Sequence, residues 1–599
     1  MILGSVSGGT PVAGNNTYSG LTTIAGGEIQ IRHPNALGTT AGKTVVLAGG
    51  DLAASGGWSG AITEPIDLTG DGEASNGALQ ANDPGTAVTF AGNLTLVGDA
   101  SVGGNSAAQD FGISGNISGT GGLTKLANNV VTLLGTNTYS GATTVSNGTL
   151  RIGNGLTNSA LPGVLFVEAG KTANFRVATN TTVTQSGVIS GGGQIFKDGF
   201  GGKLVLSASN DWTGILNINQ GSVWITTNGA LGLGPKEVLM VNGTAGQPEL
   251  HLDAGASGSI VTPADITMHV SWVNGAIFNE SGNNTILGQI KMDAGGGDSK
   301  VAVNGGTLTL AGDVIAVQAN RGLHLGGAGA GTLAGTISDA FSPVRELAKD
   351  DSGTWTVVST NTTTAALLTV NGGTLLMNGE WGDGSSAVVV NSGGTLGGTN
   401  LIDSPVYVKP GGTLAPGASI GTLTINNNLQ IGGNLKFEVD RSQTQSNDVA
   451  YVAGSIYNTN SGTLTIANLG PTLQVGDKFY LFNQPVTGGS LLTVTGGGAT
   501  WQNDLESDGS ITVLEVGGGL PPNFQPGGIT RLPDHNISLT ATGAIGSTFK
   551  LWGSTNVAAT PITNTWTLLT SGTVTFSPFT IVDLAATNYP RRFYLFSAP

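Results

Sequence analysis

The carboxylates of this sequence are the side chains whose types and spacing come closest to a chemical site. Paired acids cleave glycosides, and clustered acids bind calcium through hard oxygen ligands. The densest group is Asp67, Asp71 and Glu73, which would suit calcium. Their spacing lacks the regular acidic pattern of calcium-binding nonapeptide repeats. A solvated turn is therefore the favoured interpretation, with calcium as the weaker alternative.

Other candidate groups are scattered. Asp350 and Asp351, near Arg345 and Lys349, are most simply a charged loop. The five histidines lie far apart in the sequence, at His33, His251, His269, His324 and His535. There is no His-Glu-x-x-His motif, no nucleophile turn in a strand-to-helix context, and no Lys-Ser/Thr after a glycine-rich loop. We therefore expect no catalytic residue, no cofactor and no enzymatic activity.

The composition favours an all-β chain. The 599 residues include 100 glycines, only 10% are charged, and 39% are hydrophobic. Glycine is more than twice its usual share, yet no Gly-x-y period is present, which excludes collagen. The hydrophobic content argues against disorder. Thr- and Gly-rich segments with frequent turn signals are typical of short strands.

The charge and the missing residue types exclude several classes of partner. A net charge of −15 would repel the phosphates of nucleic acid and of anionic membranes. No apolar run is long enough for a transmembrane helix, so an integral membrane protein is not expected. Cysteine is absent, which excludes disulfides and thiolate metal sites. Met1 is not followed by a secretory leader, and we expect a mature or trimmed chain.

Any functional side chains in this protein must be positioned by short β-strands. In 121–152, apolar and polar residues alternate between Gly, Asn and Ser, which predicts half-buried strands too short to be stable alone. The segment recurs around Tyr18, more loosely in 192–225, where Lys197 stands in the place of Lys125, and in degraded form in 349–377. Repeats of about 18–25 residues suit the coils of a solenoid.

The motifs in these repeats also carry a family resemblance. The pattern GGLTK…NTYSGATTVSNGTL in 121–152 resembles the passenger-associated transport repeat, also called the autotransporter-associated β-strand repeat. The segment 408–425 resembles the C-terminal part of the same passengers. The resemblance implies a right-handed parallel β-solenoid displayed outside a Gram-negative cell, and it specifies no ligand.

The chain divides into three parts. Residues 1–516 are expected to form one continuous solenoid of about 23 coils, and the Gly/Pro-rich segment 517–528 is expected to be a linker. Residues 529–599 contain at least five short strands with many aromatic residues, which predicts a small β-sandwich. This part resembles the immunoglobulin- or fibronectin-like modules found behind such repeats in some bacterial surface proteins.

Three aromatic residues occupy equivalent places next to Ser/Thr-Gly in the repeats: Tyr18, Tyr139 and Trp212. One interpretation is an aromatic stripe that binds glycans. The other is a cap over each coil corner, and it is favoured because the copies are far apart in the sequence.

The sequence leaves three function classes open. The favoured hypothesis is an extracellular structural protein whose subunits join head to tail into a filament, fibre or sheath, because open solenoid ends expose unpaired backbone groups. The alternative is a monomeric rod-like adhesin that binds surfaces or cell-surface glycans, with a binding face at 51–115 or 245–345, where the repeats diverge. A β-helical enzyme acting on polysaccharides ranks third.

Overall fold

The computed structural model describes the chain except residues 1, 4, 8–9, 13, 74, 84–86, 105–108, 200, 241–246, 272–275, 294–297, 339–343, 362–365, 517–521, 544–546 and 599, and for residues 2–12 it describes the backbone alone. Strands account for 51% of the chain, with almost no helix, so the fold is all-β. Two compact units are present, Met1–Ser386 and Ala387–Pro599. The helices α1 (Leu505–Asp508) and α2 (Ile562–Thr565) are single turns, and none of the described helices is long and apolar enough to span a membrane.

The N-terminal unit is a parallel β-solenoid whose sheets follow the stack of coils. One sheet extends from β5 (Gly27–Ile31) to β22 (Ile189–Ser190), and a second from β8 (Ser59–Ile62) to β39 (Ile337–Ser338). A third sheet contains, in order, β21 (Thr182–Gln185), β24 (Lys203–Leu206), β26 (Gly221–Ile225), β28 (Pro248–Asp253), β31 (Ile277–Ser281), β34 (Ser299–Val303), β37 (Arg321–Gly327), β40 (Val344–Lys349) and β42 (Leu367–Val370).

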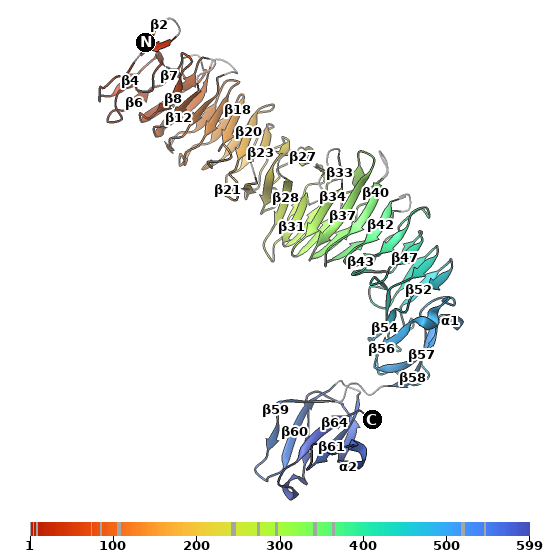
Figure 1. The fold of residues 1–599 in the computed structure, drawn as a ribbon. Coiled ribbons are helices and arrows are strands. Elements are labelled where there is room, and N and C mark those ends of the chain that lie inside the picture. Colours follow the sequence, from red (N-terminus) through yellow and green to blue (C-terminus); the bar gives the residue numbers. More distant parts are fainter. Residues whose placement is uncertain are drawn as a thin grey trace. The chain divides into compact units, whose positions relative to one another are not determined.

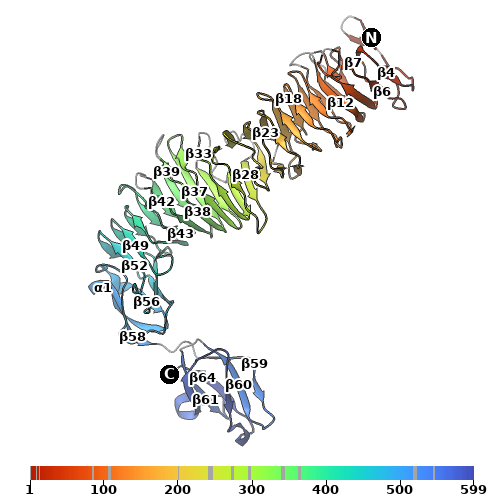
Figure 2. The same cartoon turned by 180° about the vertical axis from the view of Figure 1, so that it is seen from behind.

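A fourth sheet lies on another side of the same coils. Its strands in this unit are β29 (Val261–Thr262), β32 (Asn283–Ile286), β35 (Thr307–Leu310), β38 (Ala330–Leu333), β41 (Thr354–Val357) and β43 (Gly373–Met377). Neighbouring strands pair in parallel, as for Thr307 beside Ala330 of the next coil. Figure 1 shows β28, β31, β34, β37 and β40 as consecutive arrows, and Figure 2 shows the same unit from behind.

Residues 123–152 show how the alternating pattern becomes a coil. The strands β15 (Leu123–Lys125) and β17 (Thr143–Val145) pair with each other, as do β16 (Val130–Leu133) and β18 (Thr149–Ile152). Their alternate residues point inward and are fully or almost fully buried. Burial of one face of each strand drives the stacking, because a single coil cannot cover its own apolar side. The predicted parallel solenoid is confirmed, and its right-handedness stays a prediction.

The coil number differs from the expectation. The solenoid has about 18 turns, fewer than the sequence repeats led us to expect. The number of residues per coil varies more than the repeated sequence motif suggests. Val388 lies beside Val406 of the next coil, whereas Trp224 lies beside His251, which is a clearly longer interval in the sequence. In addition, the last strands before residue 517 leave the parallel stack.

Three fully buried lysines link successive coils: Lys125, Lys197 and Lys349. The Lys125 ammonium donates to the Ala127 carbonyl in its own turn, at 2.9 Å, and to the Asn147 carbonyl one coil later, at 3.3 Å. The other two make the same pair of contacts, to Gln220 (2.8 Å) and Gly372 (2.9 Å) of the next coil. Burial lowers the pKa of Lys125 to about 7. The ammonium groups therefore supply donors to corner carbonyls that the strands leave unpaired.

The C-terminal unit begins as a solenoid and then changes its pairing. The last parallel strands include β53 (Ile456–Asn458), β54 (Thr463–Asn468) and β56 (Thr493–Gly496). An antiparallel sheet forms from β55 (Lys478–Tyr480), which lies between β54 and β56 in the sequence, and from β58 (Ser510–Val516) and β57 (Ala499–Asp504), which come after β56. We call this sheet the antiparallel cap.

The final residues form two antiparallel sheets around one apolar cluster. One contains β59 (Asn523–Arg531), β60 (Ile537–Thr542) and β63 (Phe579–Asp583), and the other β62 (Thr567–Thr573), β61 (Thr548–Ser554) and β64 (Phe593–Ser597). Both contribute to the buried cluster of Leu539, Ala541, Phe549, Leu551, Val574, Phe579 and Phe596. Strand β59 begins inside the predicted linker 517–528, of which 517–521 lie outside the described residues. An immunoglobulin- or fibronectin-like topology and the boundaries at 516 and 529 stay predictions.

Candidate functional site

The acidic residues proposed for calcium lie on the surface of the first coils. Asp67, in β9 (Ile66–Gly70), pairs with Lys43, whose ammonium lies 2.6 Å from the Asp67 Oδ2. Asp71 and Glu73 are exposed. Within the described residues, one group of three metal-ligating side chains has its ligand atoms within 4.8 Å of one another, and it lies elsewhere, at Asp298, His324 and Glu346.

The repeat-corner aromatics differ in exposure. The Tyr139 hydroxyl hydrogen-bonds the Thr143 hydroxyl at 2.6 Å, and burial raises the pKa of Tyr139 to about 12. Tyr18 makes the same contact to Thr22 at 2.9 Å but is 39% exposed. Trp212 is fully buried and donates from Nε1 to the Gly193 carbonyl at 2.8 Å. The faces of Tyr139 and Trp212 are thus used in packing, which favours the corner-cap interpretation over a continuous glycan stripe.

A different set of rings lines the outward side of the third sheet. Trp224 of β26, His251 of β28 and Phe278 of β31 lie directly beside one another in the parallel register. The Trp224 and His251 ring centroids are 4.4 Å apart, and those of His251 and Phe278 are 4.7 Å apart, with nearly parallel planes. The Lys203 ammonium of β24 lies 3.2 Å from the Trp224 centroid. We call these four residues the ring column.

Carboxylates flank the ring column. His251 Nδ1 lies 2.8 Å from Glu280 Oε1, and His251 Nε2 lies 3.0 Å from Glu249 Oε2. Asn304, one coil further, donates to both oxygens of Glu280 at 3.1 Å. These contacts fix the imidazole between the two larger rings. Sequence reasoning missed this arrangement, although Trp224, His251 and Phe278 follow one another at equal intervals in the sequence.

A charged group lies further along the same sheet face. His324 of β37 bonds through Nδ1 to Asp350 Oδ2 at 2.7 Å, and this hydrogen bond raises the pKa of His324 and lowers that of Asp350. The Lys300 ammonium of β34 pairs with Asp351 Oδ2 at 2.8 Å. Arg345, at the start of β40, contacts the Asp298 carboxylate. The acids predicted to sit in a charged loop are thus bound to side chains of neighbouring coils, while Lys349 is buried.

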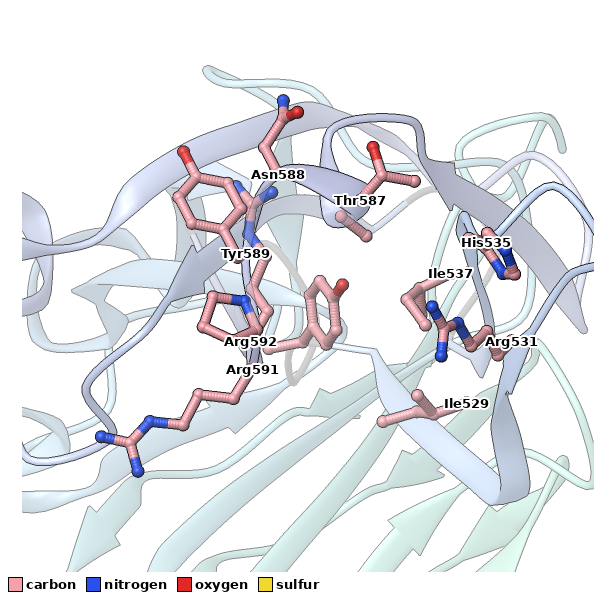
Figure 3. Close-up of a pocket in the computed structure, with 12 residues that line it drawn as sticks. Ile529, Arg531, His535, Ile537, Thr587, Asn588, Tyr589, Arg591 and Arg592 are labelled. Carbon is pink, nitrogen blue, oxygen red and sulfur yellow. The ribbon is translucent and has the colours of Figure 1, made fainter.

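A cavity of about 600 Å³ lies in the C-terminal unit. Figure 3 shows Arg531 and His535 on one side of it, Tyr589 and Arg592 on the other, and the Arg591 guanidinium pointing away. The Arg592 guanidinium is engaged by the buried Asp583, with Nη1 3.0 Å from Oδ2, and it stacks on Tyr589 at 4.5 Å. Because Asp583 and Tyr589 already engage Arg592, this cavity is a weaker candidate than the ring column.

Comparison with known families identifies the repeats. Residues 12–31, 123–152, 201–225 and 347–377 match the family model described as passenger-associated-transport-repeat. The chain thus carries four copies of the passenger-associated transport repeat. It is also 26% identical, over 85% of its length, to a protein named "Adhesin BmaC autotransporter" from Brucella suis biovar 1 (strain 1330). The match covers 17% of that relative, so the chain spans about a sixth of its length.

These similarities place the chain at the cell surface or outside a Gram-negative bacterium. Two of the buried lysines, Lys125 and Lys349, lie within matched repeats, and Lys197 lies just before one. The matched repeats also contain Tyr18, Tyr139, Trp212 and Trp224. His251, Phe278 and His324 lie between the third and fourth matched segments, where the sequence pattern diverges. The ring column therefore begins in the third matched repeat, with Lys203 and Trp224, and continues into the diverged stretch with His251 and Phe278.

Proposed function

We propose that the chain is part of an adhesin-like surface protein, in which the solenoid is a rigid support and the outward face of β24–β40 makes the adhesive contact. The ring column carries the proposal. Its residues lie opposite the apolar side of their strands, where Val223, Leu250 and Ile277 fill the core. Trp224 and Phe278 are therefore partly exposed without being needed to close the solenoid.

The column suits contact with another surface for physical reasons. Parallel hydrogen bonding between strands holds the rings about 4.5–5 Å apart, so little conformational freedom is lost on binding. Aromatic residues are over-represented at the centres of interfaces, and neighbouring carboxylates and amides provide a polar rim. Glu249, Glu280 and Asn304 form such a polar rim around the ring column. We propose cell-surface glycans as the partners of this face, because their hydroxyls match such polar groups.

The proposal is tested by adhesion of protein-coated beads to cultured host cells. Replacing both Trp224 and Phe278 with alanine is expected to weaken binding about tenfold, because two aromatic anchors are lost. The matched control is Phe166→Ala, which removes an outward aromatic residue, 39% exposed, from β19 (Leu165–Val167) on another sheet. Equal adhesion by the double variant and the unmodified chain, with both folded by circular dichroism, would exclude this face.

Head-to-tail filament assembly is the second candidate function. A filament requires the edge strands of one solenoid to pair with those of the next. The antiparallel cap includes the strands that come after β56 and does not continue the parallel pairing, which supports the separate rod over the filament. We expect the purified chain to elute as a monomer in size-exclusion chromatography with light scattering. Regular fibres in electron micrographs of the same sample would instead support the filament.

An enzyme acting on polysaccharides has weaker support. Each of the histidines near a carboxylate, namely His251, His269 and His324, is bonded to one acid through Nδ1 and has a second acid within 3.6 Å of Nε2. We propose that the chain acts without catalysis.

A further inference from the structure

We propose that Asp298, His324 and Glu346 bind a divalent transition metal of the Zn²⁺ class. The three residues come from successive coils: Asp298 immediately precedes β34, His324 lies in β37 and Glu346 in β40, and these strands are neighbours in the third sheet. Their ligand atoms all lie within 4.8 Å of one another. One imidazole and two carboxylates form a donor set suited to zinc and to other late first-row divalent ions.

The distances fit a shared ion. His324 Nε2 lies 3.6 Å from Asp298 Oδ2. Two ligands of one tetrahedral zinc, each bound at about 2.0–2.2 Å, are separated by about 3.4 Å. A shift of a few tenths of an ångström would therefore bring this pair to coordination distance.

One proposed donor atom, His324 Nε2, lacks a hydrogen-bond partner, and so does Asp298 Oδ1, the second oxygen of the carboxylate whose Oδ2 faces the histidine. His324 Nε2 and Asp298 Oδ1 are both shielded from solvent and have no donor or acceptor within hydrogen-bond distance. Such groups are rare in folded proteins, and an ion is one of the recognised reasons for them. Two second-layer contacts already orient the set. Asp350 accepts from His324 Nδ1, which leaves the Nε2 lone pair directed at the site, and the Thr369 hydroxyl donates to Glu346 Oε1 at 2.8 Å.

Arg345 is the cation that now occupies the acidic side of this group. Its Nη2 contacts Asp298 Oδ2 and lies 3.6 Å from Glu346 Oε2. The side chain is 46% exposed, so the guanidinium can move into solvent when a metal ion replaces it. Metal binding at this site therefore competes with Arg345, and this competition gives the proposal a signature that non-specific binding lacks.

The experiment is titration of the full chain, freed of metal by EDTA and dialysis, with ZnCl₂ in a calorimeter, followed by visible absorption with Co²⁺. We expect one tight site in the unmodified chain. His324→Ala is expected to weaken it about 10- to 100-fold. Glu346→Gln, which keeps the side-chain shape, is expected to weaken it as well. Arg345→Met is expected to strengthen binding, because the competing charge is removed.

His269 provides the matched control. Its Nε2 is likewise shielded and unpartnered and lies 3.6 Å from Glu237, and its Nδ1 bonds Asp293, but the described residues supply no third ligand there. His269→Ala should leave zinc binding unchanged. The site is overturned if the unmodified chain binds no zinc, if His269→Ala weakens binding as much as His324→Ala, or if Arg345→Met has no effect. Thermal unfolding separates misfolding from ligand loss, since zinc should raise the melting temperature of the unmodified chain but not of a folded His324→Ala variant.

Discussion

Truncation of Trp355 to alanine is expected to lower the free energy of unfolding of the N-terminal unit by about 3–5 kcal/mol. Trp355 lies in β41, is fully buried, and donates from Nε1 to the Gly326 carbonyl at 3.0 Å. A Cβ atom at Gly331 in the preceding coil would lie 2.4 Å from its ring, so the indole occupies the space that this glycine leaves. Truncation would open a cavity and leave a buried carbonyl without its donor.

The outward Trp224 is the matched control for this prediction. Trp224→Ala removes the same side chain from the solvent side of a neighbouring sheet, where it contributes ring stacking and a contact with Lys203. Its expected cost is about 1 kcal/mol. Urea unfolding followed by circular dichroism measures the loss of unfolding free energy in both variants, Trp355→Ala and Trp224→Ala. Equal losses for the two variants would mean that the inward and outward faces are assigned wrongly.

Replacement of Lys125 with methionine is expected to cost about 2–5 kcal/mol. Methionine fills much of the same volume but donates nothing. The carbonyls of Leu126, Ala127 and Asn147 would lose their shared donor at a buried corner. Lys171→Met is the control, because the partly exposed Lys171 donates to the Asn147 side chain, at 2.7 Å, and its loss should cost about 1 kcal/mol or less. Comparable destabilisation by both variants in urea would contradict the proposed role.

Lys125 also predicts a dependence on pH. Burial lowers its pKa from 10.5 to about 7, so between these values the unfolded chain binds more protons than the folded chain. Stability contributed by this group therefore rises as the pH increases from about 7 towards 10. Lys197 and Lys349, with pKa values lowered to about 8 by burial, act in the same direction. The free energy of unfolding, measured by urea unfolding, should rise less with pH in Lys125→Met than in the unmodified chain. If the two proteins gave parallel plots of stability against pH from about pH 7 to 9.5, the prediction would be refuted.

Much of the scaffold was predictable because it depends on local patterns. Alternation in 123–152 identified the strands, their inward residues and the stacking of copies. The same pattern matched Lys197 to Lys125 but not their burial, because their partners are backbone carbonyls that no side-chain pattern records. The coil number was overestimated since loops of different length separate similar strands.

The outward site was not predictable for a different reason. Residues that meet on a solenoid face are one coil apart, and coil length varies. Asp298 and His324 are further apart in the sequence than His324 and Glu346, and the pairing of β37 with β40 shifts register between Arg321 and Gly322. No fixed interval therefore links the three. The three rings of the ring column are equally spaced in the sequence. A search for aromatic residues that recur at the length of one coil would therefore find outward faces of this kind.

The parallel register has a mechanical consequence. Hydrogen bonds between strands such as β35 and β38 join one coil to the next, so they point along the stacking direction. Tension applied along that direction loads every coil interface in series, and the terminal coil, which is held on one side only, can peel away first while the remaining coils stay folded. A coil of about 20–25 residues would release roughly 70–80 Å of extended chain. A solenoid of this kind would thus lengthen stepwise under load and dissipate energy before it unfolds completely.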